Sequence, residues 1–529
     1  MDETHTEIIL AGLLLAVAGL VTLARVLNVP YPIFLVLGGL AIGAIPGIPP
    51  VTLDPELVLL IFLPPLLYSA AFFASLRDLR QNAGPISALS IGLVLATCVA
   101  VAVCVHAAVP GLSWEAAFVL GAIVSPTDPV AATAIAGRLG VPRRVVVVVE
   151  GEALINDATA ITAYRVALAA ITTGSFSLWE AGGEFVLGAV GGVAIGLAVG
   201  WVVANIRQRL DDPPVEITIS LFTAYAAYLP AEELHLSGVI AAVTVGLYMG
   251  SQTSRVTNAQ VRMQSIPVWT ILTFLLNSFL FVLIGLQLPV LLDELRDASY
   301  DVTTVIGYGA LASLVVIVVR IGWVFLFAAL APPLGQSDGR PDPRNVALVA
   351  WMGMRGAVSL AAALAIPLET DAGEPIRERP LILFVTFCVI LATLVLQGLS
   401  LPFAIRRLGV EPDGGDELEE NKARKLAARA ALDRLELLAE EEWAREQTIE
   451  RMRGMYRYRY DRFAARFDEE ADGDAIEART SDYLRLVAAV LEAQREVLEQ
   501  LRRDGAISDE VMRRVEHELD LEEGRFLGA

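Results

Sequence analysis

The stretch that decides the fold is Gly151-Glu-Ala-Leu-Ile-Asn-Asp-Ala-Thr-Ala-Ile161, which lies inside a long apolar run. It places Glu152, Asn156 and Asp157 in the middle of a segment long enough to cross a bilayer, which takes about 20 residues. An ionised side chain at the bilayer centre costs at least about 2.5–3.5 kcal/mol on insertion scales. We therefore expect these polar groups to serve a function that requires them at this depth.

The composition divides the chain into an apolar part and a highly charged tail. The chain has 529 residues, of which 55% are hydrophobic and 19% charged, and its mean hydropathy is +0.58. Such values are typical of a polytopic helical membrane protein. The tail from Glu411 instead holds 32 acidic and 20 basic residues, with apolar residues at helical spacing. We predict a transmembrane domain over 1–410 and an acidic helical cytoplasmic domain over 411–529. A nucleic-acid partner is not expected, because that class shows a basic surface patch.

Apolar segments predict an all-α membrane domain of about thirteen spans. They lie at roughly 7–25, 31–47, 55–75, 83–108, 115–136, 144–171, 184–205, 214–231, 236–250, 266–292, 302–331, 345–367 and 380–405. Alternate connections are rich in arginine, including Arg77, Arg80, Arg143, Arg144, Arg207 and Arg209. Because cytoplasmic loops carry the excess of basic residues, we expect an external N-terminus and a cytoplasmic tail.

The fifth predicted span is interrupted by Ser125-Pro-Thr-Asp-Pro129. Two prolines remove backbone donors and clash with the preceding turns. Freed backbone groups cannot face lipid, so the break must face protein or water. Broken helices near the midplane of transporters expose carbonyls that coordinate cations. A purely structural alternative is a kink in which Asp128 caps the second half-helix.

On the sixth span, five residues separate Glu152 from Asp157, which is about 140° of rotation, so the two carboxylates face different neighbours. A carboxylate in a partly hydrated cavity can bind a proton or a metal ion, and binding of one displaces the other. This competition is the simplest mechanism of exchange at a single site, and it makes an antiporter the favoured hypothesis. A purely structural polar contact is the alternative for Asp157.

Arg355 lies about ten residues into the twelfth span. A guanidinium at mid-membrane needs a carboxylate partner. Glu152 is the candidate, and Asp128 is the alternative. For Arg165 and Arg320, which also lie within spans, we expect structural ion pairs or hydrogen bonds to carbonyls.

Four stretches together resemble the monovalent cation:proton antiporter family of NhaP-type sodium/proton exchangers. They are Phe62-Leu-Pro-Pro-Leu-Leu-Tyr68, Ser125-Pro-Thr-Asp-Pro129, Gly151-Glu-Ala-Leu-Ile-Asn-Asp-Ala158 and Gly353-Met-Arg-Gly-Ala-Val-Ser-Leu360. They occur in the family's order, and the likeness spans roughly residues 7–408. The tail lies outside it.

The resemblance implies two inverted repeats, crossed broken helices, a homodimer and an elevator-like movement. It also implies a role for each matching residue. Asp157 would carry the cation or proton beside Asn156, Thr127 would contribute a backbone oxygen, Asp128 would support the site, and Glu152 would pair with Arg355. The Asn-Asp pair is similar to that of electroneutral members. Cation-binding oxygens would thus come from Asp157, Thr127 and Asp128.

One position departs from the resemblance: Ala153 stands where the family commonly has a serine hydroxyl. The sequence predicts an electroneutral Na+/H+ antiporter of the cell membrane, with Na+ and protons as substrates and no cofactor or enzymatic activity. K+ or Li+ transport, a K+/H+ antiporter, a gated cation channel and a non-transporting membrane sensor are the alternatives.

Overall fold

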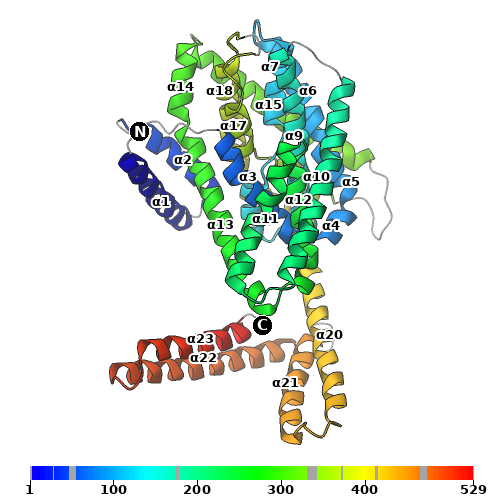
Figure 1. Ribbon diagram of the computed structural model, residues 1–529, viewed down its shortest axis with the longest axis vertical. Coiled ribbons are helices and arrows are strands. Elements are labelled where there is room, and N and C mark those ends of the chain that lie inside the picture. Colours follow the sequence, from blue (N-terminus) through cyan, green and yellow to red (C-terminus); the bar gives the residue numbers. More distant parts are fainter. Residues whose placement is uncertain are drawn as a thin grey trace. The chain divides into compact units, whose positions relative to one another are not determined.

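The computed structural model describes residues 3–27, 29–46, 55–173, 178–298, 300–330, 342–370, 373–410, 415–464 and 473–527. The chain divides into two compact units, 1–412 and 413–529. All the named secondary-structure elements of the described residues are helices (Figure 1). The hydropathy change near Leu408 lies close to the boundary between the units.

The first unit is built from nineteen α-helices and two π-helical segments among the described residues. Their bounds are α1 Glu3–Val26, α2 Tyr31–Gly43, α3 Pro55–Phe73, α4 Leu76–Gln81, α5 Ala83–Ser87, η1 Ala88–Leu93, α6 Val94–Ala108, α7 Trp114–Val124, α8 Pro129–Leu139, α9 Arg143–Thr173, α10 Leu178–Arg207, α11 Pro213–Glu233, α12 Gly238–Val256, α13 Ala259–Leu286, α14 Leu288–Asp297, α15 Val302–Leu330, α16 Pro343–Trp351, α17 Ala357–Leu364, α18 Arg379–Ala392, η2 Thr393–Gln397 and α19 Gly398–Leu408.

Six helical segments of the described residues are long and apolar enough to cross a membrane. They are 83–108, 114–137, 182–207, 259–297, 302–330 and 379–408, and shorter apolar helices cover 12–26, 31–43 and 57–73. A multi-pass helical membrane unit is therefore confirmed. Each of the thirteen predicted segments overlaps a helix or a broken helix, while the number of crossings stays a prediction.

The helices of this unit, drawn in Figure 1, make their most extensive contacts within two groups. In one, α12 packs against α3, α10 and α11. α13 packs against α2, and Val36 of α2 and Val282 of α13 lie in the same core cluster as the buried residues of the other group. In the other, α7 packs against α6 and α9, and α15 packs against α6 and α18. Glycines permit close packing in the first group, since a Cβ at Gly192 or Gly196 would meet the backbone of α12.

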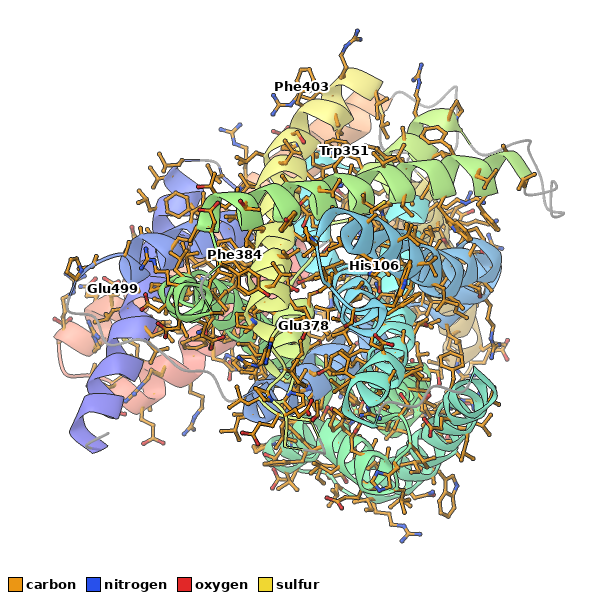
Figure 2. The ribbon with its side chains drawn as sticks, turned by 90° about the horizontal axis from the view of Figure 1, so that it is seen from above. His106, Trp351, Glu378, Phe384, Phe403 and Glu499 are labelled. Carbon is orange, nitrogen blue, oxygen red and sulfur yellow. The ribbon has the colours of Figure 1, made fainter. Side chains whose placement is uncertain are left out.

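Two helices of the second group are interrupted near their middle. The first becomes α7 and α8, separated by residues 125–128, and the second becomes α16 and α17, separated by residues 352–356. The predicted break at the paired prolines is confirmed. Trp351, which ends α16 and is labelled in Figure 2, donates its indole N–H to the Ser400 hydroxyl on α19 at 3.0 Å.

The second unit forms two helical hairpins. α20 Gly415–Leu438 packs against α21 Glu446–Ala464, and α22 Gly473–Arg503 packs against α23 Asp509–Leu527 (Figure 1). Ser508 caps α23 by accepting a hydrogen bond from the Val511 N–H at 3.3 Å. The described residues of the tail are therefore mainly helical, as predicted.

Candidate functional site: two crossed helix breaks beside α9

The two interrupted helices meet at their breaks. The backbone N–H of Asp128 donates to the Met354 carbonyl at 2.8 Å. The breaks are therefore joined through their main chains, and backbone groups that a continuous helix would pair internally are paired between the segments. Four half-helix ends meet here: the C-termini of α7 and α16 and the N-termini of α8 and α17.

Asp128 lies at the two N-termini. Its Oδ1 accepts a hydrogen bond from the Val130 N–H of α8 at 2.9 Å. Its carboxylate also lies against Gly356, the N-cap of α17, where a Cβ would collide with it. Helix N-termini carry a partial positive charge, so a carboxylate at this point stabilises both. The capping role considered as the structural alternative is therefore present.

Arg355 lies at the two C-termini and is fully buried. Its Nε donates to the Val124 carbonyl at 3.0 Å and its Nη2 to the Ser125 carbonyl at 3.4 Å, both at the end of α7. Its Nη1 donates to the Gly353 carbonyl just after α16. Its backbone N–H donates to the Thr393 hydroxyl at 3.1 Å, which ties the break to η2. A cation here complements the partial negative charge of both helix ends.

The predicted pairing of Glu152 with Arg355 is wrong. Glu152 instead forms a bidentate ion pair with Arg320 of α15, with Oε1–Nη1 at 2.6 Å and Oε2–Nη2 at 2.9 Å. Among the described residues, neither Glu152 nor Asp128 forms an ion pair with Arg355. The physical reason is that the Arg355 guanidinium donates its hydrogen bonds to carbonyls that the helix breaks leave without a partner inside their own helix. Arg320 also donates to the Val349 carbonyl at 3.0 and 3.3 Å.

Thr127 connects this ion pair to Asn156. Its hydroxyl donates to Glu152 Oε1 at 2.8 Å. The Asn156 amide donates in turn to the Thr127 carbonyl and hydroxyl oxygens, each at 3.0 Å. These bonds fix the amide orientation, because a carbonyl can only accept. The Asn156 Oδ1 is then buried, with no hydrogen-bond partner among the described residues.

Asp157 differs from all of these groups. Its side chain is 8% exposed, and it makes no hydrogen bond or ion pair with another described residue. Glu152 lies on another face of α9, as the expected 140° separation requires. Ala153, at the position where a hydroxyl would be expected from the resemblance, is a buried apolar side chain.

The polar groups beside the helix breaks do not form a conventional metal cluster. Among the residues that the structure describes, no cluster of three His, Cys, Asp or Glu side chains could hold a metal ion. The oxygens at this point of the fold are of mixed kinds: the Thr127 carbonyl, the Asn156 amide oxygen, and the carboxylate of Asp157, which follows Asn156 in α9. Oxygen ligands of this kind suit hard cations.

At the other end of α9, Arg165 joins the two helix groups. Its Nη2 contacts Glu232 Oε2 of α11 at 2.6 Å, with side-chain exposures of 50% and 28%. Glu232 also accepts a hydrogen bond from the Gly238 N–H at 3.1 Å. The expected structural ion pair of Arg165 is therefore present, and its partner belongs to the other group.

Comparison with known proteins identifies the class. Residues 12–407 match the model of the family described as sodium/hydrogen exchanger, transmembrane. The chain belongs to this family.

Individual relatives agree with the family match. An uncharacterized Na+/H+ exchanger of Mycobacterium tuberculosis is 37% identical over 98% of this chain and 96% of its own length. A Na+/H+ antiporter of Aphanothece halophytica is 33% identical over 79% of this chain and 77% of its own. A sodium, potassium, lithium and rubidium/H+ antiporter of Bacillus pumilus is 34% identical over 75% and 61%, respectively.

The fold has a solved counterpart. The sodium proton antiporter MjNhaP1 of Methanocaldococcus jannaschii superposes with a TM-score of 0.61 at 21% identity, covering 76% of this chain and 99% of that one. At this identity the likeness concerns the fold.

Proposed function

We propose that this protein is an electroneutral Na+/H+ antiporter in which Asp157 holds either a proton or a cation. The observation behind the proposal is the contrast within the site. Hydrogen bonds engage the charged groups of Glu152, Asp128 and Arg355. The Asp157 carboxylate has no hydrogen-bond or ion-pair partner among the described residues. A buried carboxylate without a partner gains most from binding a proton or a cation, because an isolated buried charge is costly.

The two substrates compete for one carboxylate. Na+ would be held by Asp157 together with the Thr127 carbonyl and with support from Asp128, and a proton would replace it on the same carboxylate. Because the neutral Asn156 stands beside Asp157, the exchange alters the charge of one group only. The reaction requires no cofactor.

Alternating access would come from movement of α9 and the crossed helices against the other helix group. We propose thirteen crossings, an external N-terminus and a cytoplasmic tail, placing the protein in the cell membrane. A homodimer through the other helix group is part of this proposal. Chemical cross-linking of the purified protein in lipid, read by mass, tests the dimer.

Exchange is tested in proteoliposomes that carry a pH gradient. Wild-type protein should show saturable proton flux on addition of Na+, with no measurable current. The Asp157→Asn variant should fold and show no exchange, because the amide cannot take up a proton. Asp301→Asn, at an exposed helix cap of α15, is the control and should exchange normally. Wild-type-like transport by Asp157→Asn would overturn the assignment.

The choice of ion is tested in the same preparation. Ala153 leaves the site without one hydroxyl ligand, and relatives differ in the ions their names specify. Na+ is the proposed substrate, and K+ and Li+ should be challenged in turn. Flux that responds to K+ but not Na+ would favour a K+/H+ antiporter, and a current without saturation would favour a channel.

A further inference from the structure

Helix α22 carries an apolar stripe on its exposed side. Leu486 is 67% exposed, Val490 and Val497 are each 56% exposed, and Leu501 is 37% exposed. Ala493 lies in the same row and is also exposed. These residues lie in the tail, outside the part of the chain that matches the exchanger family, and the function proposed above does not use them.

The spacing of this stripe is that of a seam between packed helices. From Leu486 the next positions follow after four, three and four residues, at Val490, Ala493 and Val497. An alternation of four and three residues has the period of 3.5 that keeps side chains in line along a neighbouring helix, as in coiled coils. From Leu486 to Leu501 the line extends about 22 Å along the helix axis.

A different face of α22 packs against α23, which runs beside it in the same hairpin (Figure 1). Leu491 on this face is 2% exposed, and Arg495, one turn along, pairs with Asp520 of α23 at 2.7 Å and also with Glu523. The stripe is centred about 120° around the helix from Leu491. α22 therefore has two apolar faces, and α23 covers one of them.

The other hairpin of the tail reaches the position just before the stripe. The Tyr483 ring lies against Tyr458 of α21, with the ring centroids 5.8 Å apart. Beyond this contact the side chains from Leu486 onward are exposed. Among the described residues, neither hairpin covers the stripe.

The stripe is complementary to a second copy of itself running in the opposite direction. Leu486 can be set opposite Val497 of the second copy, and Val490 then falls opposite Ala493. In this register, large and small apolar side chains alternate along the seam. One two-fold axis relates the two helices, so every contact occurs twice and the assembly closes as a dimer.

The charges beside the stripe favour this antiparallel register. One flank holds Asp482, Glu496 and Arg503, and it places Asp482 of each copy beside Arg503 of the other. Such pairs across a seam set the orientation of packed helices. A parallel pairing would instead place Asp482 beside Val487 and would form no ion pair between the copies. Arg503 now lies 3.8 Å from Glu499 of its own helix, and both side chains are more than half exposed, so Arg503 can turn toward a second carboxylate.

A membrane surface fits the stripe less well than a protein does. Residues 473–527, which form the α22–α23 hairpin, include 14 acidic and 8 basic side chains. Helices that lie on a bilayer instead have a polar face rich in Lys and Arg, which anionic lipids attract. The acidic hairpin would be repelled by such a surface.

We propose that the exposed stripe of α22 docks onto α22 of a second copy of this chain, in antiparallel orientation. The two α22–α23 hairpins then form a four-helix assembly in which the stripe is buried. This contact belongs to the tail and differs from the dimer contact proposed for the membrane unit. It does not depend on the proposed transport activity.

Disulfide cross-linking of the full chain in lipid tests the docking. In the variant Leu486→Cys/Val497→Cys, the two new thiols of one chain are about 16 Å apart along the helix and cannot join each other. Oxidation should therefore link the two chains. After trypsin cleavage at Arg485, Arg495 and Arg502, the disulfide should join peptide 486–495 to peptide 496–502.

The identity of the linked peptides decides the orientation. Links between two copies of the same peptide would show parallel pairing and overturn the antiparallel docking. Wild-type protein, whose three cysteines all lie in the first unit, should yield none of these linked peptides.

Charge reversal in the cysteine variant tests the register. Asp482→Arg should lower the yield of the mixed link roughly two- to tenfold, because two exposed ion pairs are lost for each dimer. Adding Arg503→Asp should restore the yield, since opposite charges again face each other. Leu437→Glu, at a 61% exposed leucine of α20, is the control and should leave the yield unchanged. An unchanged yield in Asp482→Arg, or no recovery in the double reversal, would overturn the proposed register.

A fluorophore on Leu486→Cys identifies any other occupant. Quenching by brominated lipids, without cross-linking of the double cysteine variant, would assign the stripe to the membrane and overturn the proposal. Absence of both signals would show an uncovered stripe and would also overturn it. Absence of exchange by the wild type would overturn the proposed function and leave this inference unaffected.

Discussion

Glu152 of α9 and Arg320 of α15 form a bidentate ion pair with exposures of 1% and 0%. Removing one partner of a buried pair leaves an uncompensated charge and typically costs about 3–5 kcal/mol. Replacing both by apolar or neutral groups of similar size is often close to neutral. The pair therefore positions α9 against α15, and its loss should be visible in stability.

We expect Arg320→Met to lower the stability by about 3–5 kcal/mol. The double variant Glu152→Gln/Arg320→Met should recover most of this loss, because no buried charge remains unpaired. Thermal unfolding of the purified protein measures both. Arg296→Ala, which removes an ion pair whose side chains are 64% and 71% exposed, is the control and should change little. Additive effects of the two substitutions would contradict the pairing.

Arg355→Ala should unfold at a lower temperature and lose exchange. The substitution leaves buried carbonyls at the end of α7 without their donors, at a cost of about 1–3 kcal/mol for each unsatisfied group. Arg355→Lys keeps the positive charge but loses the planar set of N–H donors of the guanidinium. Its unfolding temperature should lie between those of the wild type and the alanine variant. An unchanged melting temperature in Arg355→Ala would show that water or other donors satisfy these carbonyls.

Gly356→Ala should disrupt the crossing of the two breaks. A Cβ at this position collides with the Asp128 carboxylate, which caps α8 and cannot move without losing that hydrogen bond. We expect loss of exchange and a lower yield of folded protein. Gly322→Ala in α15, where a Cβ meets nothing within 4 Å, is the matched control and should behave as wild type. Normal exchange by Gly356→Ala would mean that the backbone at this break is adaptable.

Arg165→Gln should shift the balance between conformations. The ion pair with Glu232 joins α9 to α11, so a movement of the two helix groups against each other would break it. Exposed pairs of this kind contribute about 0.2–1 kcal/mol, which corresponds to a population shift of about 1.4- to 5-fold. The ratio of the external to the cytoplasmic KM for Na+ should change by this factor. Glu232→Gln, which removes the ion pair but keeps an oxygen for the Gly238 N–H, should change the ratio by the same factor, and an unchanged ratio would exclude a simple ion-pair effect.

Much of the fold could be predicted from hydropathy and proline spacing. The helix break at Pro126 and Pro129 follows from local backbone chemistry. The boundary near Leu408 follows from the change from an apolar to a highly charged composition. Both depend on short stretches of sequence, where the physical constraint is strong.

The partners of the buried charges could not be assigned in the same way. Sequence position gives the depth of a residue in a span, but not the helix that its side chain faces. Depth favoured Arg355 as the partner of Glu152, although Arg320 also lies within a predicted span, and depth cannot distinguish the two. The choice depends on the crossing of α7 with α16, which brings freed carbonyls to Arg355 and leaves Arg320 for the carboxylate.

The arrangement of Asp128 and Arg355 at opposite helix ends has a consequence for bioenergetics. These two charges offset each other, and Glu152 offsets Arg320, which leaves Asp157 as the acidic group of the site that has no partner among the described residues. In the proposed exchange Asp157 holds either one proton or one Na+, and because each brings a single positive charge, the loaded site would have the same net charge with either ion. A one-for-one exchange of this kind would move no net charge, and the membrane potential would do no work on it. The sodium ratio that the protein can sustain across the membrane would equal the proton ratio, whatever the voltage.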